Sequence, residues 1–268
     1  MSDVWSARAK SFDARARQYD DVRPSYPDAA VDAILAFAGL GAGARALEVG
    51  SGTGKATRLF LARGLEVLAL EPGARLIEVA EQSCASPAVR FVNTGFEDWP
   101  LEPGSRDLVF AAQSFHWVDQ EVGYRKAGQA LRTGGTLALF WNRPGAASGP
   151  VHEALAALYE ERAPGLGELT PEALAPVEDA IAGSIAATGL FEPPERRGFP
   201  WSQRLGTRHY VALLETYSAH ATLPDERRRH LLDGVAAIVD AASGTIDVPY
   251  ETVVHLARRR VRSNPERP

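Results

Sequence analysis

Three glycines stand at alternate positions in the stretch ALEVGSGTGKATRLF, residues 46–60, between an apolar run and a helical pattern. Glycine permits positive φ angles and lets the backbone approach a bound ligand closely. The spacing of Gly50, Gly52 and Gly54 is G-x-G-x-G, whereas NAD-binding domains carry G-x-G-x-x-G and seat a pyrophosphate on the helix that follows. The turn, which includes Ser51, therefore predicts a nucleoside-binding loop that differs from the dinucleotide type.

Two acidic residues accompany this turn. Glu48 stands two residues before Gly50, where a carboxylate would repel a phosphate but suits a ligand with an ammonium group and no phosphate. Glu71, followed by Pro72, ends the next apolar run, 21 residues after Gly50. An acid at the end of the second strand can accept hydrogen bonds from both hydroxyls of a ribose. The two acids therefore indicate an adenosine ligand that carries an amino group.

Two later loops carry further polar and aromatic side chains. VNTGFEDWPL (92–101) places Phe96 and Glu97 after the third predicted strand, where an acceptor can meet an adenine amino group. QSFHWVD (113–119) places Gln113, His116 and Trp117 after the fourth. Because open α/β sheets bind ligands outside the carboxyl ends of their strands, we expect both loops to lie beside the glycine turn.

The elements that position these loops follow from the apolar pattern. Short apolar runs alternate with helical patterns from residue 46 to 143, which is typical of βαβ units and a parallel sheet. The predicted strands are 46–49, 66–70, 89–94, 107–112 and 136–141, and the helices between them are 55–63, 74–83 and 120–131, the last closed by RTGG (132–135). Helices at 5–20 and 27–38 come first. After a loop at 142–150 we expect helical segments to about residue 188, an edge strand within 191–205 with its prolines at the ends, helices at 207–219 and 225–242, and a last strand at 246–260.

The predicted fold class is α/β: a Rossmann-like, doubly wound, mostly parallel seven-stranded sheet with N-terminal helices and late helical insertions. We interpret residues 1–268 as a single domain with three parts. Residues 1–40 form a helical lead-in or lid, 41–145 a cofactor-binding core, and 146–268 a helical substrate cap with the final strands.

Residues 46–143 resemble the class I S-adenosylmethionine-dependent methyltransferases of type 11, through LEVGSGTG, LALEP, GFEDWPL, DLVFAAQSFHWVD and QALRTGGTLALFW. The segment YDDVRPSYP (19–27) resembles the lead-in of the trans-aconitate methyltransferase-like subgroup. The resemblance implies S-adenosyl-L-methionine as cofactor and S-adenosyl-L-homocysteine as product. It implies that the glycine turn holds the methionine part, that Glu71 holds the ribose, and that Phe96 and Glu97 flank adenine. The fold carries O-, N- and C-methylation alike, so the acceptor stays open among an acidic metabolite, a secondary-metabolite intermediate and a quinone-like ring.

Methyl transfer is an in-line displacement that positioning alone can accelerate, so a general base is not required. His116 is the candidate catalytic base because the unperturbed pKa of histidine lies near neutrality; in the alternative interpretation its ring only shapes the loop. We interpret Trp117 as a wall of the acceptor pocket, and Trp141 as a core residue with one face toward it.

The lead-in and the late helices supply the remaining candidates. Tyr19 and Arg23 could close over the cofactor, with Arg23 on its carboxylate, and Tyr26 would face the acceptor; alternatively RPSYP is a rigid connector. Segment 213–224 brings Tyr217 and His220 together, where they could select the acceptor, although Tyr217 could equally be a core aromatic. Four further histidines are expected to face solvent (His152, His209, His230 and His255), and Cys84 is expected to be a small buried residue.

Composition and charge narrow the function classes. The net charge of -5 gives no electrostatic footprint for nucleic acid, and AAQSFHW replaces the Asn/Asp-Pro-Pro-Tyr/Phe signature of enzymes that methylate base amino groups. No apolar run approaches the roughly 20 residues that span a bilayer, and the first residues lack a secretory pattern. We therefore expect a cytoplasmic enzyme with a small-molecule acceptor and no metal, nucleic-acid or membrane partner.

Three alternatives stay open. An NAD-dependent oxidoreductase is opposed by the turn spacing and by the lack of a tyrosine four residues before a lysine. A non-catalytic module that binds S-adenosylmethionine is the second. The third concerns assembly, because the late helices could pair across a homodimer instead of forming a private lid.

Overall fold

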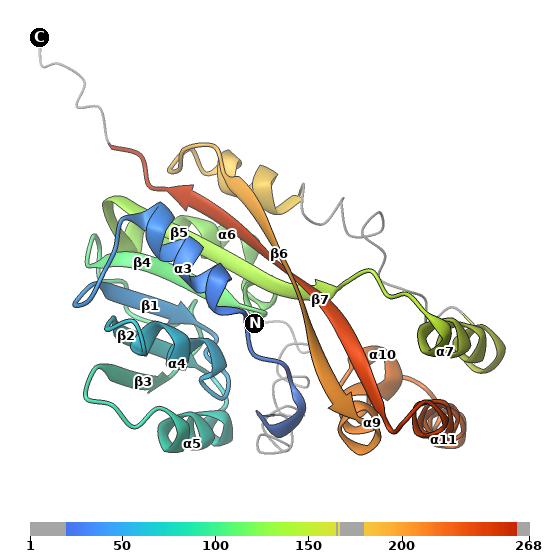
Figure 1. Cartoon of the computed structure of the whole chain (residues 1–268). Helices are drawn as coiled ribbons and strands as arrows, with labels where there is room; N and C mark the ends of the chain where they lie inside the picture. The colour runs from blue at the N-terminus through green and yellow to red at the C-terminus, as the bar shows by residue number, and fades with distance from the viewer. Residues whose placement is uncertain (1–19, 165, 167–179, 262–268) are drawn as a thin grey trace, which may run out of the picture.

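The computed structural model describes residues 20–164, 166 and 180–261, and within them seven strands form one sheet in the order β3-β2-β1-β4-β5-β7-β6 (Figure 1). The first five strands pair in parallel, whereas β7 runs antiparallel to both β5 and β6. This topology confirms the predicted fold class. The strands are β1 (Arg45–Val49), β2 (Glu66–Glu71), β3 (Val89–Asn93), β4 (Arg106–Ala112), β5 (Leu131–Pro144), β6 (Glu195–Gly206) and β7 (Thr245–Arg258).

Helices cover both faces of the sheet and build the far end of the molecule. They are α3 (Asp28–Ala38), α4 (Lys55–Leu61), α5 (Ala74–Ser83), the short 3-10 helix η1 (Phe115–Trp117), α6 (Gln120–Ala130), α7 (Pro150–Arg162), α9 (Thr207–Glu215), α10 (Ser218–Ala221) and α11 (Asp225–Ala241). A further helix occupies 180–187. The helices predicted over 27–38, 74–83 and 225–242 are confirmed to within a residue, while the one predicted over 5–20 lies almost wholly outside the described residues.

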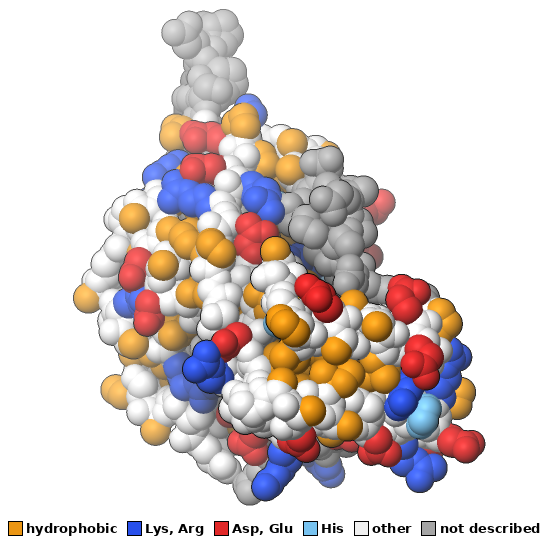
Figure 2. All heavy atoms as spheres, turned by 45° about the vertical axis from the view of Figure 1, so that its right-hand side comes forward, with side chains coloured by type: hydrophobic (Ala, Val, Ile, Leu, Met, Phe, Trp, Pro, Cys, Tyr) orange, Lys and Arg blue, Asp and Glu red, His pale blue; other side chains and the backbone are white. Residues whose placement is uncertain are grey.

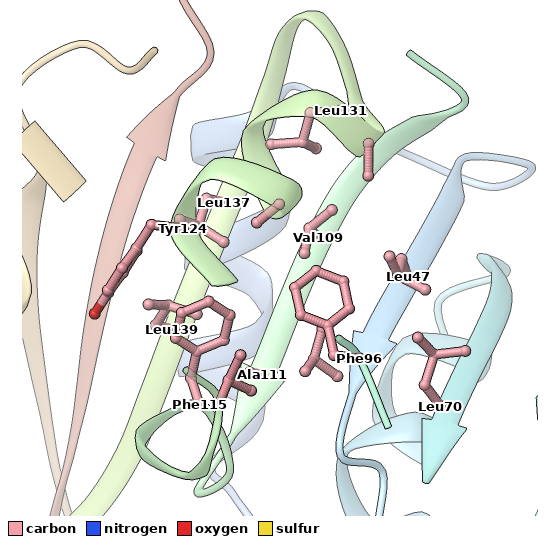
Figure 3. Packing of buried hydrophobic residues seen from close by; sticks show 14 of the residues in the cluster. Leu47, Leu70, Phe96, Val109, Ala111, Phe115, Tyr124, Leu131, Leu137 and Leu139 are labelled. Atoms are coloured by element: carbon pink, nitrogen blue, oxygen red, sulfur yellow. The ribbon is translucent and has the colours of Figure 1, made fainter. Parts of the chain in front are cut away.

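The central strands read as continuous apolar runs because both of their faces are covered. Successive side chains point to opposite sides of a strand. Leu47 and Val109 therefore join the cluster beneath α6, as Figure 3 shows, whereas Leu108 and Phe110 join the cluster beneath α3 and α4. Phe60 of α4 is fully buried, with its ring 4.1 Å from that of Phe110. The two clusters fix the sheet, and with it the loops at its carboxyl edge.

Strand β5 is longer than predicted. It begins at Leu131, where it pairs with Arg106 across a register shift, and it continues to Pro144 because β7 pairs with it from Thr136 to Pro144. The stretch 132–135, which we expected to separate helix from strand, therefore lies inside β5. Gly134 has φ 74° there, a conformation that glycine adopts without strain.

Two details of the predicted cap were wrong. The helix expected over 207–219 is divided, because α9 ends at Glu215 and α10 begins at Ser218. Pro200 lies inside β6 and not near its end. β6 is an edge strand that pairs only with β7, and a missing N–H on its other side removes no ladder hydrogen bond.

The prediction that His255 faces solvent was also wrong. It lies on β7 with 2% of its surface exposed, and its ring centre is 6.0 Å from that of Trp141. The prediction failed because β7 is an interior strand, flanked by β5 and β6, and the face that carries His255 is buried. The partial alternation of this strand did not reveal that placement. Cys84 is buried as predicted, with 5% exposed.

Strands β6 and β7 continue beyond the end of β5 as a two-stranded ribbon, and α7, α9, α10 and α11 gather at its far end (Figure 1). We call these four helices the cap. A third apolar cluster holds the cap together, with Leu158, Leu213 and Leu231 contributed by three different helices. On the surface of the cap, basic and acidic side chains surround apolar ones (Figure 2).

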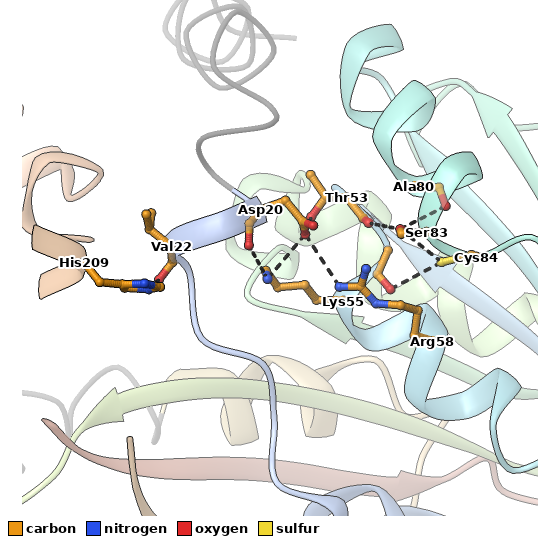
Figure 4. Close-up of polar contacts among 10 residues, drawn as sticks. Asp20, Val22, Thr53, Lys55, Arg58, Ala80, Ser83, Cys84 and His209 are labelled. Carbon is orange, nitrogen blue, oxygen red and sulfur yellow. Dashed lines mark hydrogen bonds and ion pairs between the residues drawn. The ribbon is translucent and has the colours of Figure 1, made fainter. Parts of the chain in front are cut away.

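Residues 20–23, which we call the strap, are fastened to the sheet by Asp20 (Figure 4). The Asp20 carboxylate accepts a hydrogen bond from Thr53 Oγ1 at 2.6 Å and pairs with Lys55 Nζ at 3.3 Å. Lys55 Nζ also donates to the Asp20 carbonyl at 2.6 Å. Because Thr53 and Lys55 belong to the glycine-rich turn and the start of α4, the strap is attached directly beside that turn.

The other end of the strap is fastened to the cap. His209 Nε2 donates to the Val22 carbonyl at 3.3 Å, and Arg23 Nη2 donates to the Thr216 carbonyl at 2.7 Å. Val22 itself is buried in the cap cluster. The strap therefore connects the glycine turn with the cap through a few polar contacts.

Replacing Asp20 with asparagine should loosen the strap while the sheet stays folded. Asparagine loses the ion pairs with Lys55 and Arg58 and weakens the charge-assisted bond from Thr53, so amide hydrogen exchange at Val22 and Arg23 should rise by about tenfold. Asp28→Asn is the matched control, because the Asp28 side chain is 77% exposed and pairs with Arg63 away from the strap. Equal exchange in the two variants would contradict the fastening role.

Candidate active site

A cavity of about 2140 Å³ runs along the carboxyl edge of the parallel strands and beneath the cap. Known ligand pockets hold roughly 300–1,000 Å³, so this volume has room for two ligands side by side. The cavity brings together most of the predicted site residues: Arg23, Tyr26, Glu48, Gly50, Ser51, Glu71, Pro72, Phe96, Glu97, Gln113, His116, Trp117, Trp141, Tyr217 and His220. Gly52 and Gly54 belong to the turn without lining the cavity, and Tyr19 lies outside the described residues.

The glycine turn follows β1 as predicted, with φ 70° at Gly50, 56° at Gly52 and 83° at Gly54. A Cβ atom at Gly50 would lie 2.6 Å from the Ser114 Cβ, and Ser114 Oγ donates to the Val49 carbonyl. A Cβ atom at Gly54 would lie 2.6 Å from Cys84 Sγ. Both glycines are therefore required for conformation and for space.

Glu71, at the end of β2, is 7% exposed and lies against the turn. Its Oε2 accepts the backbone N–H of Gly52 and its Oε1 that of Gly73, each at 2.9 Å. A carboxylate oxygen has two lone pairs, so each oxygen keeps acceptor capacity for a hydroxyl in the cavity. The arrangement suits a ligand with two adjacent hydroxyl groups.

Glu48 is the most deeply buried acid of the site, with 1% exposed. The pKa of its carboxyl is raised to about 8, chiefly by burial and to a smaller extent by the nearby Glu71 charge, while the hydrogen bond from Thr57 opposes the shift. That bond joins Thr57 Oγ1 to Glu48 Oε2 at 2.5 Å. The carboxyl is therefore mostly protonated at pH 7 until a cation comes near it.

The loop after β3 supplies an apolar wall. Phe96 is 3% exposed and stacks with Trp99, and Lys126 Nζ donates to the Glu97 carbonyl at 2.8 Å. Glu97 Oε1 accepts the backbone N–H of Asp119 at 3.0 Å, which ties this loop to the loop after β4. One oxygen of Glu97, which we predicted to accept a hydrogen bond from adenine, therefore already accepts one within the protein.

The loop after β4 begins with Gln113, whose φ of 59° is unusual for a residue other than glycine. Such conformations persist where the surroundings hold them, often at functional sites. Gln113 N donates to the Phe140 carbonyl at 2.9 Å and its side-chain Nε2 to the Asn142 carbonyl at 3.3 Å. These bonds fix the start of the loop, and the residues that follow in η1, His116 and Trp117, line the cavity.

His116 is held by Trp141 from the neighbouring strand. Trp141 Nε1 donates to His116 Nδ1 at 3.2 Å, and the His116 and Trp117 rings are 4.5 Å apart. Burial and the nearby charge of Arg143 lower the pKa of His116 to about 4. An indole N–H only donates, so Nδ1 bears the lone pair and the neutral ring carries its proton on Nε2.

The sequence did not single out several cavity residues: Asn142, Arg143, Tyr159, Tyr210 and Tyr250. Tyr159 and Tyr210 lie on helices of the cap, and Tyr250 lies on the part of β7 that pairs with β6. No local sequence motif marks these three tyrosines, because they come together only through the packing of the cap against the sheet. Asn142 and Arg143 directly follow Trp141 at the end of a predicted strand, and that position alone could have placed them at the site.

The described part of the chain lacks two features. Among its histidines, cysteines and acids there is no group of three that could hold a metal ion. Among its helices, none is long and apolar enough to cross a bilayer.

Comparison with solved structures shows that other proteins share this fold. The Haemonchus contortus phosphoethanolamine N-methyltransferase 2, solved with phosphomonomethylethanolamine and S-adenosylhomocysteine, superposes with a TM-score of 0.56 at 17% identity over 96% of this chain. The chain spans 59% of that protein's length. The cyclase SpnF superposes with a TM-score of 0.54 at 18% identity. At these identities the likeness shows the fold alone.

Sequence comparison is more specific. The family model described as "Methyltransferase domain" matches residues 47–139. An uncharacterized methyltransferase of Mycobacterium tuberculosis is 31% identical over 248 residues, covering 91% of this chain and 93% of the relative. A protein of Saccharomyces cerevisiae named as a probable S-adenosylmethionine-dependent methyltransferase is 33% identical over 137 residues, covering 49% of this chain and 46% of that one. With the glycine turn, the acid at the end of β2 and this sheet order, these matches show that the chain belongs to the class I S-adenosylmethionine-dependent methyltransferases of type 11.

Proposed function

We propose that the chain transfers the methyl group of S-adenosylmethionine to a small-molecule acceptor held between η1 and the cap. The observation that carries this proposal is the continuity of the cavity, which reaches from Glu71 at the sheet edge to His220 in the cap. A nucleoside on the sheet side would leave the cap side for a second molecule. Membership of the methyltransferase family argues against the NAD-dependent alternative.

The residues at the sheet edge fit the cofactor. We assign the ribose hydroxyls to Glu71, whose carboxylate is fixed by two backbone amides and still faces the cavity. The amino group would lie near Glu48, and the adenine beside Phe96. The cofactor supplies an activated methyl group on a positively charged sulfur. The protein's part is to hold that group in line with the acceptor and to exclude water.

Arg23, Tyr26, Trp117 and Trp141 line the cavity near its middle. The Arg23 guanidinium lies 4.6 Å above the Tyr217 ring, and the Tyr26 ring packs edge-on against Phe140 at 4.8 Å. We propose that these side chains flank the reacting groups. The finer resemblance to the trans-aconitate-like subgroup makes an acidic metabolite one candidate acceptor, and the aromatic walls make a ring compound another.

We further propose that His116 serves as a hydrogen-bond donor to the acceptor and not as its general base. Trp141 occupies Nδ1, so the nitrogen left for the cavity is Nε2 with its proton. A pKa near 4 also leaves the ring a weak base. A donor at this point can orient an acceptor oxygen, which is sufficient for carbon or carboxylate nucleophiles that need little proton removal.

The first test is cofactor binding measured by calorimetry with S-adenosylmethionine, S-adenosylhomocysteine and NAD. The first two should bind, and Glu71→Gln should weaken them by about 10- to 100-fold because hydrogen bonds to a charged acceptor are lost. Glu66→Gln, at the exposed opposite end of β2, is the matched control. Binding of NAD alone would overturn the proposal, and cofactor binding without methyl transfer to any acceptor would favour the non-catalytic module.

The second test concerns the proton on Glu48. At pH 7 only about a tenth of a group with pKa 8 is ionised, and a ligand ammonium group nearby would lower that pKa and expel the proton. Binding of S-adenosylhomocysteine at pH 7 should therefore release up to one proton, seen as a dependence of the binding enthalpy on the buffer's ionisation enthalpy. Glu48→Gln should abolish this dependence. Proton uptake by the wild type would contradict the assignment.

The third test reads the protonation of His116 directly. Nitrogen-15 NMR of labelled protein should show Nδ1 without a proton and Nε2 with one at pH 7, and titration should leave the ring neutral down to about pH 5. His116→Gln assigns the signal, and Trp141→Phe should increase the share of the other tautomer. A ring that titrates near pH 6.5 would restore the general-base interpretation.

A further inference from the structure

Five ring side chains from separate parts of the chain meet at the cap end of the cavity: Tyr159 of α7, Tyr210 of α9, Tyr217 and His220 at α10, and Tyr250 of β7. We call them the ring cluster. Tyr159 OH is hydrogen-bonded to His220 Nε2 at 2.7 Å, and the Tyr217 and His220 ring centres are 6.1 Å apart. Tyr250 stacks on Trp201 with ring centres 4.8 Å apart. Flat surfaces and polar ring edges therefore line the same space.

Two polar atoms of the ring cluster are buried without a partner among the described residues. His220 and Tyr250 each have 5% of their surface exposed, yet His220 Nδ1 and the Tyr250 hydroxyl accept or donate no hydrogen bond. The Tyr217 side chain lies close enough to the Tyr250 hydroxyl to contribute to the rise of the Tyr250 pKa. A buried polar atom without a partner is costly, and few are found in native proteins. Both residues line the cavity, so a bound molecule can satisfy both atoms.

The surroundings of the ring cluster disfavour charge of either sign. Burial lowers the pKa of His220 to about 4 and raises the pKa of Tyr210 to about 12, and it also raises the pKa of Tyr159 and Tyr250. The cluster is therefore a set of neutral hydrogen-bonding groups. Glu160 and Glu215, the acids at this end of the cavity, are both exposed at its rim.

The neighbouring cation is Arg23. Its Nη2 donates to the Thr216 carbonyl at 2.7 Å, and its guanidinium lies 4.6 Å over the Tyr217 ring, close enough for its charge to act on the Tyr250 hydroxyl. Arg143 also lines the cavity, 5.8 Å from the Trp141 ring. The side chains of the ring cluster are thus themselves neutral, with Arg23 as the adjacent cation.

We propose that the ring cluster binds the non-reacting end of the methyl acceptor, and that this end is an uncharged ring bearing a carbonyl or hydroxyl oxygen rather than a carboxylate. In this arrangement the Tyr159 hydroxyl is the donor to His220 Nε2, and the imidazole proton is then on Nδ1, where it donates to the ligand oxygen. The Tyr250 hydroxyl donates to the same oxygen or accepts from a ligand hydroxyl. The inference rests on the proposed function, because it assumes that the sheet side of the cavity holds the cofactor.

The experiment measures, by equilibrium dialysis against protein saturated with S-adenosylhomocysteine, the binding of three naphthalenes of similar size. 2-Acetylnaphthalene has a neutral carbonyl, 2-naphthoate a carboxylate, and 2-ethylnaphthalene no oxygen. The ketone should bind about tenfold more tightly than either of the others. Equal affinities, tighter binding of the carboxylate, or no measurable binding of the ketone would overturn the proposal.

Variants separate recognition from folding. Tyr250→Phe removes a hydroxyl that has no protein partner, so stability should be unchanged or slightly higher while the affinity for the ketone falls about fivefold and that for 2-ethylnaphthalene stays the same. Tyr159→Phe should act in the same direction by freeing the His220 tautomer. The control Thr133→Val removes a hydroxyl from an exposed residue outside the cavity lining, and it should change none of the three affinities. A Tyr250→Phe variant that keeps full affinity for the ketone would contradict the assignment.

Failure of the inference can be told from failure of the proposed function. If the wild type does not bind S-adenosylhomocysteine, the cofactor assignment is wrong and the probes lose their meaning. If it binds S-adenosylhomocysteine but does not distinguish the three naphthalenes, the cofactor site stands and only the role of the ring cluster falls.

Discussion

The carboxylate of Glu71 is the contact on which the sheet edge depends. One of its oxygens holds Gly52 in the turn after β1 and the other holds Gly73 in the turn before α5, so a single side chain sets two neighbouring loops relative to each other. Buried backbone N–H groups need partners, and here an anion provides two of them. The group is only 7% exposed, so these two bonds are made largely out of contact with solvent.

The cavity changes character along its length. The sheet edge is lined by acidic side chains and backbone amides. There the buried Glu48 has a raised pKa, which a positively charged group beside it would lower. At the cap end, phenol and imidazole rings stay neutral and offer directional hydrogen bonds. Between the two, Trp141 fixes the tautomer of His116 through a contact across strands β4 and β5.

The sequence was sufficient for the sheet-edge half of the site. Gly50, Glu71 and Gln113 follow strands whose apolar runs are easily recognised, and parallel strands bring their carboxyl ends together. It was insufficient where distant segments meet. Tyr159 and Tyr250 are 91 positions apart and approach only because the ribbon of β6 and β7 carries the cap. The ring contact between Trp141 and His255 depends on the pairing of β5 with β7. Local sequence propensity also failed for Pro200, which is tolerated inside β6 because β6 is an edge strand. It failed as well for the break between α9 and α10, which depends on packing within the cap.

The cap has an apolar cluster of its own, separate from the two clusters that clasp the sheet. The two halves are joined by the ribbon, the strap and the segment leading to α7. Substitutions that remodel the cap interior therefore need not disturb the packing around the glycine turn. Such a division allows related proteins to change their acceptor through substitutions in the cap alone, while the part that binds the nucleoside stays the same.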